Sequence, residues 1–158
     1  MRKFLFLIFT TFFIIFTGCT TLRPATVVKN DNISNYQYLI INGTTSLTSG
    51  TGGFVNGVYY SESKSVNPRD VISGYMAKKG FIILPELDNE LLDKTLLVTY
   101  GESGRREVFW GYTTEVTIQF ISPVTKQLSF SSTAEGIGST EADDIKKAIT
   151  RALDALFE

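Results

Sequence analysis

The apolar residues near the end of the chain follow a helical spacing. They recur at i, i+4, i+7, i+8 and i+11, so they share one side of an α-helix. Ser139 or Thr140 can cap the start of this helix, and acidic residues follow, where the helix dipole favours negative charge. We therefore predict a closing amphipathic helix with one buried stripe, made of Ile145, Ile149, Ala152, Leu153 and Leu156.

A second helix is indicated in the middle of the chain. Asn67 is a favourable N-cap, Pro68 suits the first helical position, and Asp70 lies near the positive end of the dipole. Gly80 marks the expected end of this helix. The residues between them predict a short apolar stripe, formed by Val71, Ile72, Tyr75 and Met76.

Runs of β-branched, aromatic and aliphatic residues predict the strands. Between 108 and 122 the pattern alternates, and Pro123 begins a tight reversal. Two amphipathic helices can cover one face of a mostly antiparallel sheet, so we predict an α+β fold, a two-layer sandwich with both helices on one face. The strands are expected at 36–41, 81–84, 95–100, 108–122 and 127–134.

The N-terminus has the organisation of a secretion signal. Arg2 and Lys3 precede an uncharged apolar run from Phe4 to Phe16. As a helix this run would span about 20 Å, which is short for a permanent crossing of about 30 Å of hydrocarbon. Cys19, the sole cysteine, follows where the apolar run ends.

Phe16-Thr17-Gly18-Cys19 resembles the lipobox of bacterial lipoproteins. The resemblance implies that residues 1–18 are a cleaved signal peptide and that the Cys19 thiol carries a diacylglyceryl anchor. The alternative is an uncleaved anchor with a chance cysteine. Polar residues 19–35 then predict a flexible tether, and 36–158 a single domain. No acidic cluster follows Cys19 and Thr20 is not aspartate, which favours an outer-membrane protein that faces the periplasm.

Composition excludes several classes of function. The chain has no histidine and its one cysteine is assigned to the lipid, so the common general base, thiol nucleophile and His/Cys zinc site are missing. Loss of Arg2 and Lys3 changes the formal net charge from −1 to −3, unlike that of a nucleic-acid-binding protein. We expect no catalytic residues, no cofactor and no metal.

Two polar motifs have structural interpretations. Ser61-Glu62-Ser63-Lys64 matches the S-x-x-K motif of penicillin-binding enzymes, but it lies in a polar segment before the helix start and lacks the partner motifs. The acids Glu141, Asp143 and Asp144 fit a helix start better than a metal site.

A Gly-rich segment from Gly43 to Gly57 is the first candidate for partner binding. It is long for a structureless connection, and such loops are often functional. Phe54 and Tyr59 would provide aromatic contacts for a partner. The alternative is a flexible connection.

A predicted turn at 101–106 is the second candidate. Arg105 and Arg106 could bind a phosphate or carboxylate, with Trp110 close by. The alternative, which we favour, is a solvated turn whose arginines pair with Glu102 and Glu107.

Segments 65–72, 98–106 and 135–145, together with Cys19, resemble a group of small Gram-negative envelope lipoproteins of unknown function. More distantly, the order of elements is similar to the α+β domains of LpoB, a penicillin-binding-protein activator, and of the TolB N-terminal domain, which implies binding of protein partners without catalysis. We expect a lipid-anchored, non-catalytic binding or scaffold module of the envelope. The alternatives are a carboxylate-dependent enzyme acting on cell wall or glycan, and a self-assembling structural lipoprotein.

Overall fold

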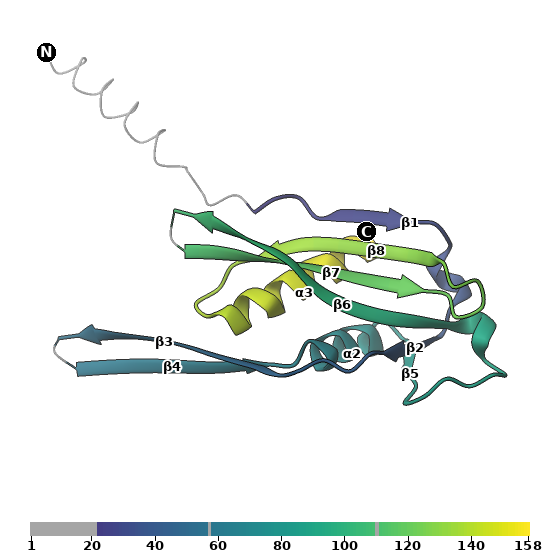
Figure 1. The fold of residues 1–158 in the computed structure, drawn as a ribbon, viewed down its shortest axis with the longest axis horizontal. Coiled ribbons are helices and arrows are strands. Elements are labelled where there is room, and N and C mark those ends of the chain that lie inside the picture. Colours follow the sequence, from purple (N-terminus) through teal and green to yellow (C-terminus); the bar gives the residue numbers. More distant parts are fainter. Residues whose placement is uncertain (1–21, 57, 110) are drawn as a thin grey trace, which may run out of the picture.

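A computed structural model describes residues 22–158, apart from residues 57 and 110 (Figure 1). Cys19 and the predicted signal peptide lie outside these residues. Two short 3-10 turns, η1 (Ile33–Asn35) and η2 (Leu92–Lys94), connect longer elements. Those elements are β1 (Thr26–Lys29), β2 (Tyr38–Ile41), β3 (Leu47–Val55), β4 (Val58–Val66), α2 (Pro68–Lys78), β5 (Ile82–Ile83), β6 (Thr95–Val108), β7 (Gly111–Ile121), β8 (Leu128–Gly136) and α3 (Glu141–Phe157).

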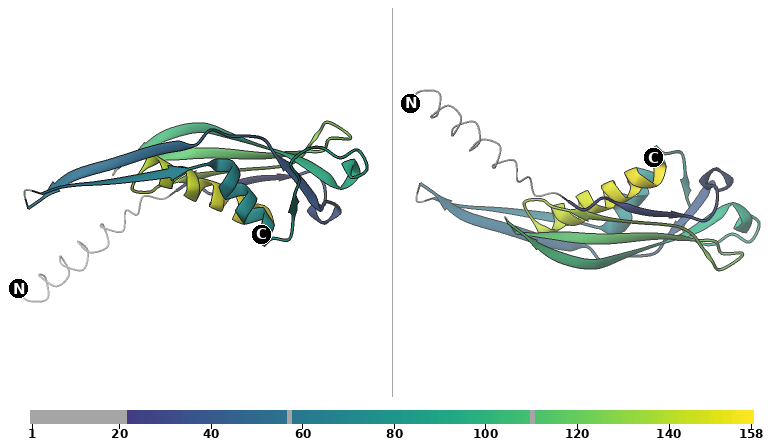
Figure 2. Two further views of the ribbon diagram at one scale, coloured as in Figure 1. Left: turned by 90° about the horizontal axis from the view of Figure 1, so that it is seen from below. Right: turned by 90° about the horizontal axis from the view of Figure 1, so that it is seen from above.

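The strands form one six-stranded sheet and one separate hairpin. The sheet has the order β1-β8-β7-β6-β2-β5, in which β2 runs parallel to β5 and β6 and the other neighbours are antiparallel. The separate hairpin consists of β3 and β4. Both helices lie on the same side of the large sheet (Figure 2). The predicted α+β class and mostly antiparallel sheet are confirmed.

The predicted helix starts are confirmed at atomic detail. The Asn67 side chain accepts a hydrogen bond from the Arg69 N–H at 3.1 Å, and Pro68 is the first residue of α2. Thr140 caps α3 by accepting from the Asp143 N–H at 3.3 Å. Gly80 has φ of +95°, a conformation that favours glycine, directly after α2 ends.

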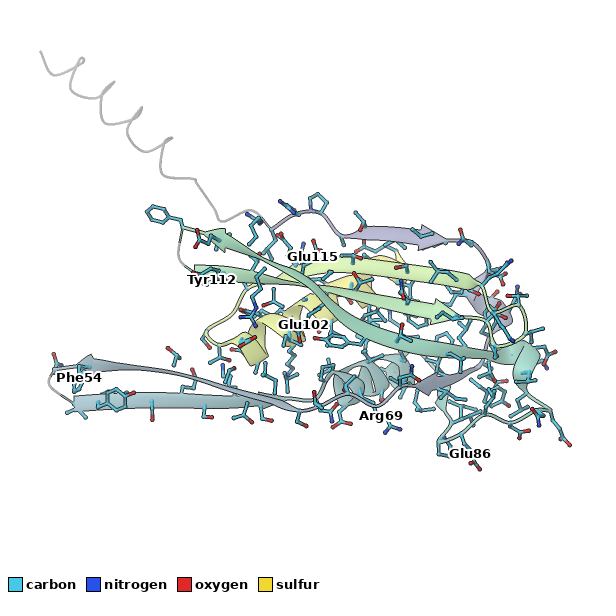
Figure 3. All side chains as sticks on the ribbon, viewed as in Figure 1. Phe54, Arg69, Glu86, Glu102, Tyr112 and Glu115 are labelled. Carbon is cyan, nitrogen blue, oxygen red and sulfur yellow. The ribbon has the colours of Figure 1, made fainter. Side chains whose placement is uncertain are left out.

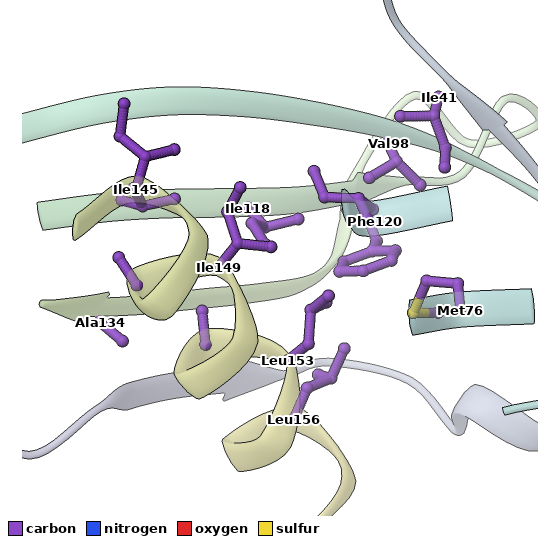
Figure 4. Close-up of a cluster of buried hydrophobic side chains, with 14 of the residues drawn as sticks. Ile41, Met76, Val98, Ile118, Phe120, Ala134, Ile145, Ile149, Leu153 and Leu156 are labelled. Carbon is purple, nitrogen blue, oxygen red and sulfur yellow. The ribbon is translucent and has the colours of Figure 1, made fainter. Parts of the chain in front are cut away.

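The apolar stripe of α3 packs on the inner face of β7 and β8, and it is the centre of the core (Figure 4). Ile118 and Phe120 from β7 meet the helix, and Met76 closes the core from α2. Burial of these side chains removes apolar surface from water and provides the main stabilisation. All five predicted stripe residues are buried: Ile145, Ile149, Ala152, Leu153 and Leu156.

The prediction of a flexible tether over 19–35 is wrong for much of its length. Strand β1 pairs with β8 from Thr26↔Thr133 to Lys29↔Phe130, and η1 follows it. Val27 packs against the core while its neighbours face outward, as expected for an edge strand. The folded domain therefore extends toward the N-terminus well before residue 36.

Two segments predicted as loops are strands. All of β3 lies within the Gly-rich segment, and the polar motif at 61–64 lies within β4. The predicted turn at 101–106 is instead the middle of β6, which continues to Val108. A bulge between Glu102 and Gly104 accommodates an extra residue there, so strand pairing continues through a sequence rich in turn residues.

Candidate functional site

Two long hairpins extend in the same direction from the body of the domain (Figure 1). One is β3–β4, which we call the first arm, and the other is the outer part of β6–β7, which we call the second arm. Figure 3 places Phe54 and Tyr112 near the two tips, at one end of the molecule. The first segment predicted for partner binding is therefore a projecting arm rather than a loop.

The tip of the first arm carries exposed aromatic and apolar side chains. Phe54 is 76% exposed, and Val58, Tyr59 and Tyr60 are exposed as well. The rings of Phe54 and Tyr59, which face each other across the hairpin, have centroids 5.1 Å apart. A side chain at Gly52 would meet the Tyr59 ring, with Cζ 2.8 Å from the added Cβ. Glycine thus leaves room for Tyr59 to lie against β3.

The base of the first arm is fixed on the start of α3. Ser49 Oγ accepts a hydrogen bond from the Ala142 N–H at 2.8 Å. On the other strand, Lys64 Nζ lies 2.5 Å from Asp143 Oδ2 and 3.1 Å from Ser139 Oγ. The Lys64 contact lowers the pKa of Asp143, and Asp143 in turn raises the pKa of Lys64. These contacts lie toward the base of the arm, whereas the described residues of its tip are exposed and project from the domain (Figure 1).

The second arm also ends in exposed aromatic residues. Phe109 is 85% exposed and Tyr112 is 57% exposed. The Tyr112 hydroxyl donates to Glu107 Oε1 at 3.2 Å. Trp110, predicted as a binding residue, lies outside the described residues. The sequence did not place Phe109 or Tyr112 at a hairpin tip, because its turn-forming residues indicated a reversal at 101–106.

Arg105 and Arg106 both form ion pairs within the domain, but not with the acids predicted for a turn. Arg105 pairs with Glu141 at the start of α3. Arg106 donates from Nε to Glu135 Oε1 at 2.9 Å and from Nη2 to Oε2 at 2.7 Å. Since the arginines are adjacent residues of a strand, they diverge toward different elements. Of the residues predicted for binding, Phe54 and Tyr59 lie together at the tip of the first arm. Arg105 and Arg106 instead pair with acids on α3 and β8.

Glu135 is a buried acid that no pattern in the sequence indicated. It lies on β8 and is 2% exposed, and besides Arg106 it accepts from the Arg23 N–H at 3.0 Å. The hydrogen bonds from Arg106 lower the pKa of Glu135 to about 2, although burial alone would raise it. Glu135 thus connects β8, the second arm and the start of the described chain.

Glu135 makes the stability of the domain depend on pH. Its pKa in the folded state, about 2, lies below the ordinary value of 4.5. The ionised carboxylate therefore contributes stability above pH 4.5, and this contribution is lost as the pH falls toward 2. We expect the free energy of unfolding to fall more steeply over this range in the wild type than in Glu135→Gln, as measured by urea unfolding. Parallel curves for the two proteins would contradict this assignment.

A hollow of about 250 Å³ lies between the second arm and the start of α3, lined in part by Arg105, Tyr112, Glu141 and Asp144. Both acids have partners: Glu141 pairs with Arg105, and Asp144 accepts from the Gly138 N–H. Burial raises the pKa of Asp144. The acids at this helix start thus bind neighbouring backbone and side chains, which agrees with the structural interpretation of their sequence.

Within 22–158, leaving out 57 and 110, no cluster of three or more Asp, Glu, His or Cys residues could hold a metal ion. In the same part of the chain, no helix has the length and apolar content needed to cross a membrane.

The fold is similar to a solved structure at low sequence identity. The fold is similar to that of a PelC dodecamer from Paraburkholderia phytofirmans, at 10% sequence identity and a TM-score of 0.48. The similarity covers 82% of this chain and 92% of that chain. No protein-family model matches the sequence, and no curated protein matches it significantly. The function is therefore inferred from the geometry of the two arms.

Proposed function

We propose that this protein is a lipid-anchored, non-catalytic binding module of the bacterial envelope, and that the tip of its first arm binds a protein partner in the periplasm. The observation that carries the proposal is the exposed cluster of Phe54, Val58, Tyr59 and Tyr60 on a hairpin that projects from the domain. The anchor itself rests on the lipobox at Cys19. The outer membrane is the expected location.

The composition of the first arm suits recognition of a protein surface. From Leu47 to Ser61 it contains no charged residue, so a partner can cover its tip without burying an unpaired charge. Aromatic side chains of this kind contribute much of the binding energy in protein interfaces. A solvated connection would not need four exposed apolar side chains around one turn.

The backbone of the first arm offers a second mode of contact. Strands β3 and β4 form a sheet of their own, so each has one edge that no described strand pairs. A two-stranded hairpin is only marginally stable by itself, and an extended segment of a partner can add to such an edge through main-chain hydrogen bonds.

Binding by the first arm can be tested with paired substitutions at its tip. Phe54→Ser combined with Tyr59→Ser should remove most partner capture in envelope pull-downs, because two buried aromatic contacts are lost. The melting temperature should stay nearly unchanged, since both side chains are exposed. Val124→Ser is the matched control, because Val124 is 58% exposed in the turn between β7 and β8.

A photo-crosslinking amino acid at position 54 identifies what the arm contacts. A discrete adduct with a different envelope protein supports the proposal. An adduct with the mass of two copies of this chain favours the self-assembling alternative instead. No adduct at position 54, or equal capture by the double variant and the wild type, would contradict binding by the first arm.

A further inference from the structure

The start of the described chain lies against the second arm. Arg23 lines the same hollow as residues 103–106 of β6, and its N–H binds Glu135, the partner of Arg106. Phe109 follows Arg106 by three residues, a distance of about 10 Å along a strand. The tip of the second arm is therefore close to the point where the N-terminal segment joins the domain.

The length of chain before this point is short. Cys19 precedes Leu22 by three residues, which can span at most about 10 Å when fully extended. A lipid on Cys19 therefore holds the membrane surface close to Leu22. The tip of the second arm extends about 10 Å beyond Arg106, which is as far as Cys19 can lie from Leu22. The tip can therefore reach the membrane surface to which the lipid on Cys19 is attached.

The side chains of this tip suit the boundary between water and lipid. Phe109 offers an exposed apolar ring, and Tyr112 offers a ring with a polar hydroxyl. Aromatic residues of both kinds are stable at membrane interfaces, where one end is apolar and the other is hydrated. In water alone, an 85% exposed Phe109 leaves most of its apolar surface unburied.

Basic residues lie beside the same attachment point. Lys146 and Lys147 are exposed on α3, and together with Arg151 they line a hollow that Leu22 borders. Lysine and arginine side chains near a membrane surface attract the phosphate groups of lipids. The end of the domain nearest the anchor thus combines exposed aromatic rings with cations.

We propose that the tip of the second arm, through Phe109 and Tyr112, inserts into the interface of the phospholipid bilayer beside the lipid on Cys19. This inference rests on the lipidation included in the proposed function. Attachment at two points would fix the orientation of the domain on the membrane. The first arm would then present its tip to a protein partner from a defined position.

Fluorescence quenching by brominated phospholipid tests the insertion directly. The chain has a single tryptophan, Trp110, so Trp110→Phe provides a background without tryptophan fluorescence. One variant adds Phe109→Trp, and its matched control adds Phe54→Trp at the tip of the first arm. Both are purified as the mature lipidated protein and reconstituted in vesicles of phosphatidylethanolamine and phosphatidylglycerol, with and without bromine on the acyl chains.

We expect strong quenching and a blue-shifted emission at position 109, and neither at position 54. Tyr112→Trp in the same background should behave like the variant at 109. Circular dichroism melts establish that each variant is folded. If only one of the tip variants fails to fold, the other still provides the measurement.

The outcomes separate this inference from the proposed function. If the lipidated protein shows no quenching at 109 and 112, the proposed insertion is wrong, while the proposed partner binding by the first arm is unaffected. Protection of position 109 from aqueous acrylamide without quenching by bromolipid indicates a protein occupant, and also overturns it. Quenching at both 109 and 54 supports insertion but contradicts a protein-binding first arm. If mass spectrometry finds a mature N-terminus without lipid, both the proposed insertion and the proposed lipid-anchored function are wrong.

Discussion

Replacing Gly136 with alanine should destabilise the domain by about 3 kcal/mol or more, because the added methyl group cannot be accommodated. Gly136 is the last residue of β8 and lies under α3. A Cβ there would overlap the carbonyl oxygen of Asp144 and come within 2.5 Å of the Ala148 nitrogen. Both atoms belong to the helix backbone, so the whole helix would have to move away from the sheet.

Gly101→Ala is the matched control for this effect. Gly101 also lies in a strand, but a Cβ at that position has no neighbour within 4 Å. We expect little change or a small gain in stability there, since alanine has less backbone freedom to lose than glycine. Urea unfolding followed by circular dichroism compares the two variants. Similar midpoints for both would show that α3 does not pack as closely on β8 as described.

Leu153→Ala should lower the free energy of unfolding by about 2–5 kcal/mol, the cost of lost burial plus a cavity in the core. Leu153 is fully buried in the middle of the α3 stripe. Leu87→Ala is its control, because Leu87 is 44% exposed between β5 and η2 and should lose little. Equal shifts in melting temperature for the two variants would contradict the packing of α3 in the core.

The helices and the inner strands could be predicted because each depends on local pattern. Caps at Asn67 and Thr140 together with a continuous apolar stripe define a helix wherever it packs. The alternation at 116–120 likewise defines which side of β7 is buried, and the structure buries Val116, Ile118 and Phe120. These helices and strands were sufficient to predict the α+β class.

The first arm was not predicted, because its strands have no continuous buried face to impose a period. Strand β4 is exposed over most of its length, so apolar and polar residues need not alternate along it. One local signal could have indicated the first hairpin: the sequence Asn56-Gly57 between Val55 and Val58, because Asn-Gly is common in two-residue hairpin turns. Asn56 has φ of 50°, as such a turn requires.

The ion pairs of the second arm depend on contacts across the fold that sequence spacing does not indicate. Arg106 and Glu135 are 29 residues apart and lie on strands separated by β7. A turn at 101–106 would instead pair the arginines with the nearest acids, Glu102 and Glu107. A continuous β6 instead extends the side chains toward β8 and α3.

The pairing of β1 with β8 has a consequence for how the chain folds. Thr26 and Thr133 are partners, so more than a hundred residues separate the two strands. Closing so long a segment is entropically unfavourable until the intervening sheet has formed, and non-local contacts of this kind slow folding. In the proposed export across the membrane, the N-terminal end would emerge first, while β8 would be among the last elements to follow. The segment that joins the domain to its proposed lipid therefore waits unpaired until nearly all the chain has crossed, and its docking on β8 is expected to be one of the last steps of folding.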